Sequence, residues 1–211
     1  MRDAFYAKYG EYLNEQEKAD ALTVGNRRFM ITVELEGPFA NPLVYANPHL
    51  VPVLKAALGP NYVLDNFGVV VSLPGAEQQH MHRDGTPLFN GQLAGMIPVY
   101  ALTTVFPLIE MNEQHGTTSV VVGTHRYRGD DADPEVPVIP EGSAVLWDYR
   151  LFHGGTPNRS NQPRPIVYLT YGRKWWRDAD NYKSNKQRRL ALPDGFLDTV
   201  PEEARHLFGQ M

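Results

Sequence analysis

The chain has 211 residues, enough for one domain with a hydrophobic core, and 42% of them are hydrophobic. Its formal net charge of -4 argues against a nucleic-acid partner. It contains no cysteine, which excludes disulfides and metal–thiolate sites and leaves histidines and carboxylates as metal ligands. Because no apolar run reaches the roughly 20 residues that span a bilayer and no signal-peptide pattern begins the chain, we expect a cytoplasmic protein with no membrane partner.

Two helices are expected before the first strand. Residues 2–22 have the pattern of one amphipathic helix, and residues 48–58 that of a second, which Gly59-Pro60 closes. After residue 61 the pattern favours strands, in segments rich in Val, Ile, Thr, Tyr or Leu: 62–73, 97–109, 118–122, 143–149 and 165–172. Two Gly/Pro/Asp-rich stretches, residues 85–96 and 126–138, are expected to be loops.

These elements predict a mainly β protein whose double-stranded β-helix (jelly-roll) core is flanked by α-helices. We expect one domain over residues 1–211. It would comprise a helical N-terminal part over about 1–60, a jelly-roll core over about 61–175 and a C-terminal segment over 176–211.

The first candidate site lies in Pro74 to Gly85, which reads Pro-Gly-Ala-Glu-Gln-Gln-His-Met-His-Arg-Asp-Gly. On a strand, residues two apart project to the same face, so His82 and Asp84 can present an imidazole and a carboxylate to one ion. The pair alone is weak evidence, because two ordinary polar residues on a surface strand would give the same pattern.

A second segment strengthens the case. His153 ends an apolar run directly before Gly154-Gly155, and Arg164 follows eleven residues later at the start of the next predicted strand. Two histidines and one carboxylate form the facial triad of non-haem iron oxygenases, which leaves open positions for a 2-oxo acid and dioxygen. A planar guanidinium suits the far carboxylate of 2-oxoglutarate, and a buried Arg without such a partner would be costly.

The sequence resembles the phytanoyl-CoA dioxygenase family of iron(II)/2-oxoglutarate-dependent oxygenases from about residue 62 onward. The similar stretches are Gln79-x-x-His82-x-Asp84, Asn112 to Arg126, His153 with Asn158, Ser160 and Arg164, Tyr171 to Asp178, and Leu207-Phe-Gly. The resemblance implies that His82, Asp84 and His153 bind Fe(II) and that Arg164 binds the C5 carboxylate of 2-oxoglutarate.

The resemblance also suggests further cofactor-binding residues. Gly155 stands where many members have a Ser that helps to hold the carboxylate, so Thr156 or another hydroxyl is expected to substitute. Gln79, Thr103 and Asn66 are candidates for the cavity wall. Strand alternation would turn Gln79 away from His82 unless a twist or bulge intervenes.

The predicted activity is hydroxylation of an unactivated C–H bond in a small or mid-sized metabolite, with 2-oxoglutarate and dioxygen consumed and succinate and CO2 released. Halogenating relatives have a small residue in place of the carboxylate, so Asp84 favours hydroxylation, desaturation or ring formation. Two alternatives stay open. One is a cupin-like metal protein that uses His80 and His82, and the other is a catalytically inactive β-sandwich that binds a ligand or protein.

Overall fold

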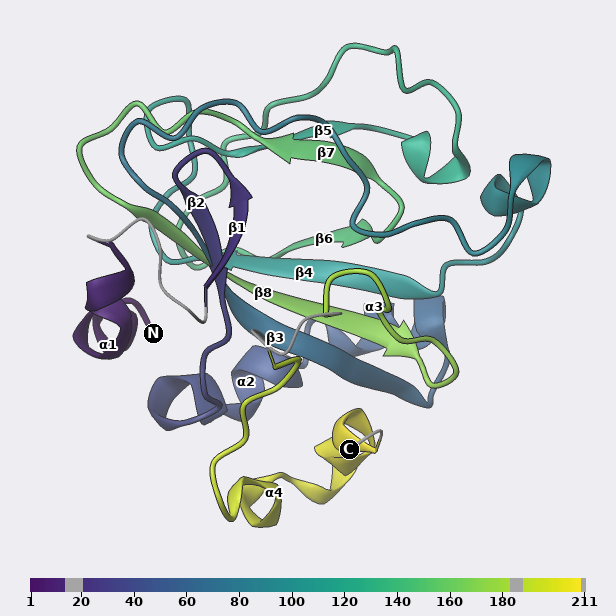
Figure 1. The fold of residues 1–211 in the computed structure, drawn as a ribbon. Coiled ribbons are helices and arrows are strands. Elements are labelled where there is room, and N and C mark those ends of the chain that lie inside the picture. The colour runs from purple at the N-terminus through teal and green to yellow at the C-terminus, as the bar shows by residue number, and fades with distance from the viewer. Residues whose placement is uncertain (14–20, 183–187, 210–211) are drawn as a thin grey trace.

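The strands form two antiparallel sheets that face each other (Figure 1). The structure, a computed structural model, describes residues 1–13, 21–182 and 188–209. The larger sheet has the order β1-β2-β3-β8-β4-β6, and the smaller sheet pairs β5 with β7. The strands are β1 (Ala21–Gly25), β2 (Arg28–Ile31), β3 (Tyr62–Ser72), β4 (Ala101–Pro107), β5 (Thr118–Val121), β6 (Val145–Asp148), β7 (Phe152–Gly155) and β8 (Arg164–Arg173).

Short helices surround the sheets, and α2, α3 and α4 lie on the face of the larger sheet that is turned away from the smaller one (Figure 1). The α-helices are α1 (Arg2–Tyr9), α2 (Pro42–Tyr45), α3 (Val51–Leu58) and α4 (Phe196–Thr199). The 3-10 helices are η1 (Gly10–Leu13), η2 (Gly37–Ala40), η3 (Gly91–Gly95), η4 (Thr124–Arg126) and η5 (Glu202–Phe208). None of the helices in the described ranges is long and apolar enough to cross a membrane.

The central strands β3 and β8 are buried on both faces, which explains their nearly continuous apolar sequences. Successive side chains of a strand point to opposite faces. On β3, Phe67, Val69 and Val71 pack into the main core, whereas Asn66 and Val70 line a cavity on the other face. The same alternation on β8 gives one row to the core and one row to the cavity. The larger sheet is therefore a wall between the main core and the candidate site.

The mainly β class is confirmed, and each of the five predicted strand segments overlaps a strand. The helix predicted over residues 48–58 is α3, which begins at Val51. The single helix predicted over residues 2–22 is wrong: α1 ends at Tyr9, η1 ends at Leu13, and residues 21–25 form β1. Its middle part, residues 14–20, lies outside the described residues. The N-terminal part is thus not wholly helical, because β1 and β2 pair as a hairpin whose turn contains Arg27 at φ 49°.

Candidate active site

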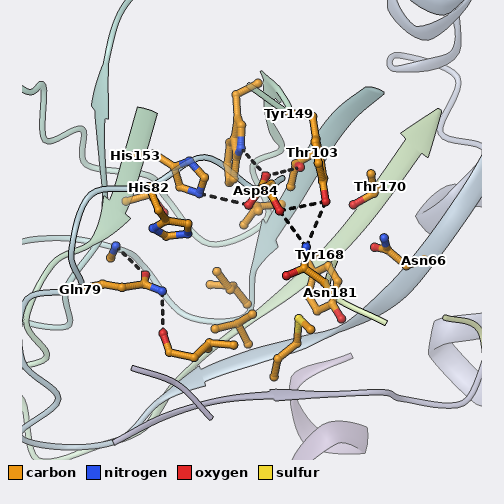
Figure 2. Close-up of a pocket in the computed structure, with 18 of the residues that line it drawn as sticks. Asn66, Gln79, His82, Asp84, Thr103, Tyr149, His153, Tyr168, Thr170 and Asn181 are labelled. Atoms are coloured by element: carbon orange, nitrogen blue, oxygen red, sulfur yellow. Dashed lines mark hydrogen bonds and ion pairs between the residues drawn. The ribbon is translucent and has the colours of Figure 1, made fainter. Parts of the chain in front are cut away.

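Two histidines face each other across an antiparallel pairing at the edge of the smaller sheet. His82 N donates to His153 O at 2.8 Å, and His153 N donates to His82 O at 2.9 Å. Directly opposed residues of an antiparallel pair project to the same face, and the two imidazole ring centres lie 4.6 Å apart. Asp84, two residues beyond His82, points to the same place (Figure 2).

Backbone carbonyl groups fix which nitrogen of each ring faces the site. His82 Nδ1 lies 3.0 Å from His80 O, and His153 Nδ1 lies 2.8 Å from Leu151 O. A carbonyl oxygen only accepts, so each Nδ1 carries the proton and each Nε2 keeps its lone pair for a metal. Burial, and then the charge of the His153 ring, lower the pKa of His82 and so favour its neutral form.

Hydrogen bonds hold one of the two oxygens of the Asp84 carboxylate. Its Oδ2 accepts from Thr103 Oγ1 at 2.9 Å and from Trp147 Nε1 at 3.4 Å. Its Oδ1 lies 3.5 Å from His153 Nε2. One ligand atom from each of His82, Asp84 and His153 lies within 4.8 Å of the other two. Two imidazole nitrogens and a carboxylate oxygen in this arrangement fit iron(II) with further positions open.

These three side chains line a cavity of about 190 Å³, whose walls come from both sheets. Gln79 and His82 lie on one side of it, and Asn66 and Thr170 lie on the other (Figure 2). Asn66 and Thr170 are directly opposed on β3 and β8.

Arg164 is the first residue of β8 and lines the same cavity, although only 1% of it is exposed. Its Nη2 donates to Ser72 Oγ at 2.7 Å. Its Nε and Nη1 are buried and have no hydrogen-bond partner among the described residues. Burial, and then the positive charge of Arg28, lower its pKa. Buried donors left unpaired are costly, and a carboxylate in the cavity is the group that fits them best.

Comparison with known proteins agrees with this geometry. The profile of the family described as Phytanoyl-CoA dioxygenase (PhyH) matches residues 1–166, more than half of the chain. The chain belongs to this family. A curated relative, Dioxygenase af480 of Aspergillus fumigatus, is 25% identical over 190 residues, which are 86% of this chain. The chain spans only 58% of the length of that relative.

Solved structures share the fold at low sequence identity. HygX from Streptomyces hygroscopicus, solved with nickel, 2-oxoglutarate and hygromycin B bound, is 14% identical with a TM-score of 0.60, over 84% of this chain and 80% of HygX. SnoN, a non-haem alpha-ketoglutarate-dependent epimerase from nogalamycin biosynthesis, is 16% identical with a TM-score of 0.60, over 92% of this chain and 86% of SnoN. The jelly-roll fold predicted from the sequence is therefore confirmed in this member of the PhyH family.

The other candidate residues have different surroundings. Gln79 lines the cavity. Residues 76–81 do not form a regular strand, so strand alternation does not turn its side chain away from the cavity. Its Nε2 donates to Val24 O at 2.7 Å, and its Oε1 accepts from Gly155 N at 3.0 Å. Thr103 lines the cavity and contacts Asp84. Asn66 lines it too, with Oδ1 buried and without a hydrogen-bond partner among the described residues.

The structure does not support Thr156 as the replacement for the family Ser. Its hydroxyl accepts from Thr117 N at 2.7 Å and donates to Thr117 O at 3.3 Å, so both of its bonding directions are used on the residue before β5. Thr156 is not among the residues that line the cavity, whereas its neighbour Gly155 is. The group that lies beside Gly155 is instead the guanidinium of Arg28.

His80, the key residue of the cupin-like alternative, is exposed and lies outside the group of three. Its backbone carbonyl, not its ring, takes part in the site by orienting His82.

Sequence reasoning missed a polar network behind Asp84. The Tyr149 hydroxyl donates to Asp178 Oδ2 at 2.7 Å and lies 3.1 Å from the backbone oxygen of Asp84. Asn181 Nδ2 donates to that same backbone oxygen at 2.7 Å. Asp178 and Asn181 come from the segment after β8, which no motif in the sequence connects with Asp84. Asp178 ends the stretch Tyr171 to Asp178 that resembles the family, and its burial, at 3% exposure, shows that it is part of the site.

Proposed function

We propose that the chain is an iron(II)- and 2-oxoglutarate-dependent oxygenase that hydroxylates an unactivated C–H bond of a small or mid-sized metabolite. The observation that carries the proposal is that three ligand atoms and a buried, incompletely bonded guanidinium line one cavity. His82, Asp84 and His153 would hold iron, and Arg164 would bind the distal carboxylate of 2-oxoglutarate. When bound, the two cofactors supply oxidation by dioxygen, with release of succinate and CO2.

The chain's own residues orient and shield this chemistry. The carbonyl groups of His80 and Leu151 keep both Nε2 atoms available, and Thr103 turns one oxygen of Asp84 toward them. Trp147 covers His153, their ring centres being 5.3 Å apart, and limits the access of water. Such fixed positions are what aim a reactive group at one bond of a substrate.

The far side of the cavity supports a polar substrate of natural-product type. Asn66, Tyr168 and Thr170 offer hydrogen bonds without a net charge. The bound hygromycin B of HygX and the nogalamycin origin of SnoN support substrates of this kind. The presence of Asp84 as a carboxylate ligand supports hydroxylation over halogenation.

The test is substrate-stimulated succinate formation from 2-oxoglutarate with iron, ascorbate and air, coupled to mass detection of products. A gain of 16 Da, expected for inserted oxygen, supports hydroxylation. A loss of 2 Da indicates desaturation or ring formation, and an unchanged mass with altered stereochemistry indicates an epimerase such as SnoN.

Asp84→Ala is expected to abolish product formation and weaken metal binding, because it removes one of three ligands. His80→Gln is the matched control: it lies in the same segment and keeps the backbone carbonyl that orients His82. It should bind metal and turn over like the wild type. Full activity of Asp84→Ala would mean that this ligand is misassigned, and loss of metal by His80→Gln would favour the cupin-like alternative.

A further inference from the structure

The side chain of Asn66 presents an unpaired acceptor at the far side of the cavity. Asn66 is 2% exposed and lines the cavity, and its Oδ1 is buried without a hydrogen-bond partner among the described residues. In Figure 2 this oxygen is turned toward the other labelled residues of the cavity. No other residue of the cavity wall, within the described ranges, has a buried acceptor atom left unpaired. Because such an acceptor is costly, a ligand with a donor group is the partner that fits it.

A β-bulge and a carboxylate fix the orientation of the Asn66 amide. The register of β3 against β8 shifts between Leu64 and Asn66, so Asp65 is the extra residue of a bulge. Bulges re-aim side chains and are frequent beside active sites. Asn66 Nδ2 donates to Asp65 Oδ2 at 3.1 Å, and the same oxygen accepts from Arg189 Nη1 at 2.7 Å. A carboxylate paired with an arginine only accepts, so the amide nitrogen faces it and the amide oxygen is left for the cavity.

Thr170 complements this acceptor. Thr170 and Asn66 are directly opposed on β8 and β3, and both line the cavity. The threonine hydroxyl can donate, whereas the amide oxygen can only accept. A hydroxyl group of a ligand both donates and accepts, so it can bond to both residues, while a carbonyl oxygen could bond only to Thr170 and an N–H only to Asn66. The pair therefore matches a hydroxyl group best.

Asn66 lies too far along β3 to contact the cosubstrate. Arg164 Nη2 donates to Ser72 Oγ, and these two residues are directly opposed at one end of the β3–β8 pairing. Asn66 precedes Ser72 by six residues on β3, which is about 20 Å at the usual rise of a strand. A five-carbon chain is only roughly 5 Å long. A cosubstrate held by Arg164 thus leaves Asn66 for the substrate.

We propose that Asn66 is a specificity-determining residue, which binds a hydroxyl group of the substrate together with Thr170. The inference rests on the proposed function, which places the substrate in this cavity. Thr103, which bonds to the metal ligand Asp84, is directly opposed to Thr170 on the next strand. Thr103 and Asn66 are therefore two strand spacings apart, about 10 Å. The substrate class is a hydroxylated metabolite that is oxidised several bonds away from the hydroxyl group that Asn66 recognises.

The test compares two small probes with the same six-membered ring. Cyclohexanol donates and accepts a hydrogen bond, whereas cyclohexanone only accepts. Each is titrated into protein loaded with Mn(II) and 2-oxoglutarate, and broadening of its proton NMR signals by Mn(II) reports binding near the metal. Protein loaded with Zn(II) gives the diamagnetic baseline. We expect cyclohexanol to bind at least about fivefold more tightly, as one added hydrogen bond to a buried acceptor implies.

Asn66→Leu is expected to remove this preference, so that the two dissociation constants differ by less than about twofold. Thr104→Val is the matched control. It removes another buried hydroxyl that has no hydrogen-bond partner among the described residues, on a residue that is not part of the cavity wall. It should keep the preference for cyclohexanol. Asn66→Ala decides the matter if Asn66→Leu fails to fold, because it leaves the ion pair of Asp65 with Arg189 in place.

Equal binding of the two probes to the wild-type protein would overturn the proposal, and so would a preference that survives the loss of the Asn66 amide. The same conclusion follows if Mn(II) broadens neither probe while 2-oxoglutarate is bound. In these cases only the role of Asn66 fails. If the protein binds neither Mn(II) nor 2-oxoglutarate, the proposed function fails, and this inference fails with it.

Discussion

A single hydroxyl decides how the Asp84 carboxylate is turned. Thr103 Oγ1 donates to Asp84 Oδ2 at 2.9 Å and leaves Oδ1 toward the histidines. Thr103→Val keeps the shape of the side chain and removes that bond. Groups that orient a metal ligand typically contribute about 10–100-fold to metal affinity. We therefore expect the affinity for Mn(II) or Fe(II) to fall by a factor in this range, measured by competition with a chelating dye.

The adjacent Thr104 is a matched control for this prediction. Its side chain is fully buried, and its hydroxyl has no hydrogen-bond partner among the described residues. Thr104→Val should therefore leave metal affinity unchanged and leave stability unchanged or slightly higher. Equal metal affinity of the two variants would show that Thr103 does not orient Asp84.

At the scale of elements, the segment after β8 supports the site from behind. Tyr149→Phe removes the hydroxyl that donates to the buried Asp178 carboxylate. Because a hydrogen bond to a buried charged group is lost, we expect a cost of about 1–3 kcal/mol in the free energy of unfolding. We also expect faster amide hydrogen exchange in residues 178–182, which this network ties to Asp84.

Tyr62→Phe serves as the control for this variant. The Tyr62 hydroxyl is buried without a hydrogen-bond partner among the described residues, and Tyr62 is not a residue of the cavity wall. Its removal should change neither the exchange of residues 178–182 nor the unfolding free energy by more than a few tenths of a kcal/mol. Unchanged exchange in Tyr149→Phe would mean that the segment is held by other contacts.

The elements also show which features the sequence could predict. Long strands such as β3 and β8 have enough Val, Ile and Tyr residues to be found from propensity. Strand β7 was missed because it contains Gly154 and Gly155, which weaken any strand pattern. The β1–β2 hairpin was missed because apolar residues near the N-terminus suit a helix equally well, and pairing with β3 decides the outcome.

The same contrast holds for the site. His82, Asp84, His153 and Arg164 could be selected because their residue types are rare in such positions and their spacing is informative. The position of Arg28 beside Arg164 could not be predicted, since it depends on the pairing of β2 with β3 and on the lack of a side chain at Gly155. Contacts between residues so far apart in the sequence depend on the fold, and local pattern does not contain them.

For the molecule as a whole, the incompletely bonded guanidinium of Arg164 links stability to cosubstrate binding. A ligand that binds only the folded state stabilises it by about 2.7 kcal/mol at a free concentration of 100 times Kd. For a chain of this size each kcal/mol raises Tm by about 2–4 °C. We therefore expect saturating 2-oxoglutarate with Mn(II) to raise Tm by about 5–11 °C, measured by scanning calorimetry against Mn(II) alone.

The same reasoning predicts an unusual sign for a core substitution. Arg164→Met keeps most of the side-chain volume and removes a buried cation with two unpaired nitrogens, and with it the repulsion on Arg28. Large core substitutions usually destabilise, but replacing an uncompensated buried charge by an apolar group can stabilise. Arg164→Met without ligand should melt at or above the wild-type Tm, and the shift caused by 2-oxoglutarate should disappear. If Arg164→Met melts well below the wild type and keeps the full Tm shift caused by 2-oxoglutarate, this guanidinium does not bind the cosubstrate.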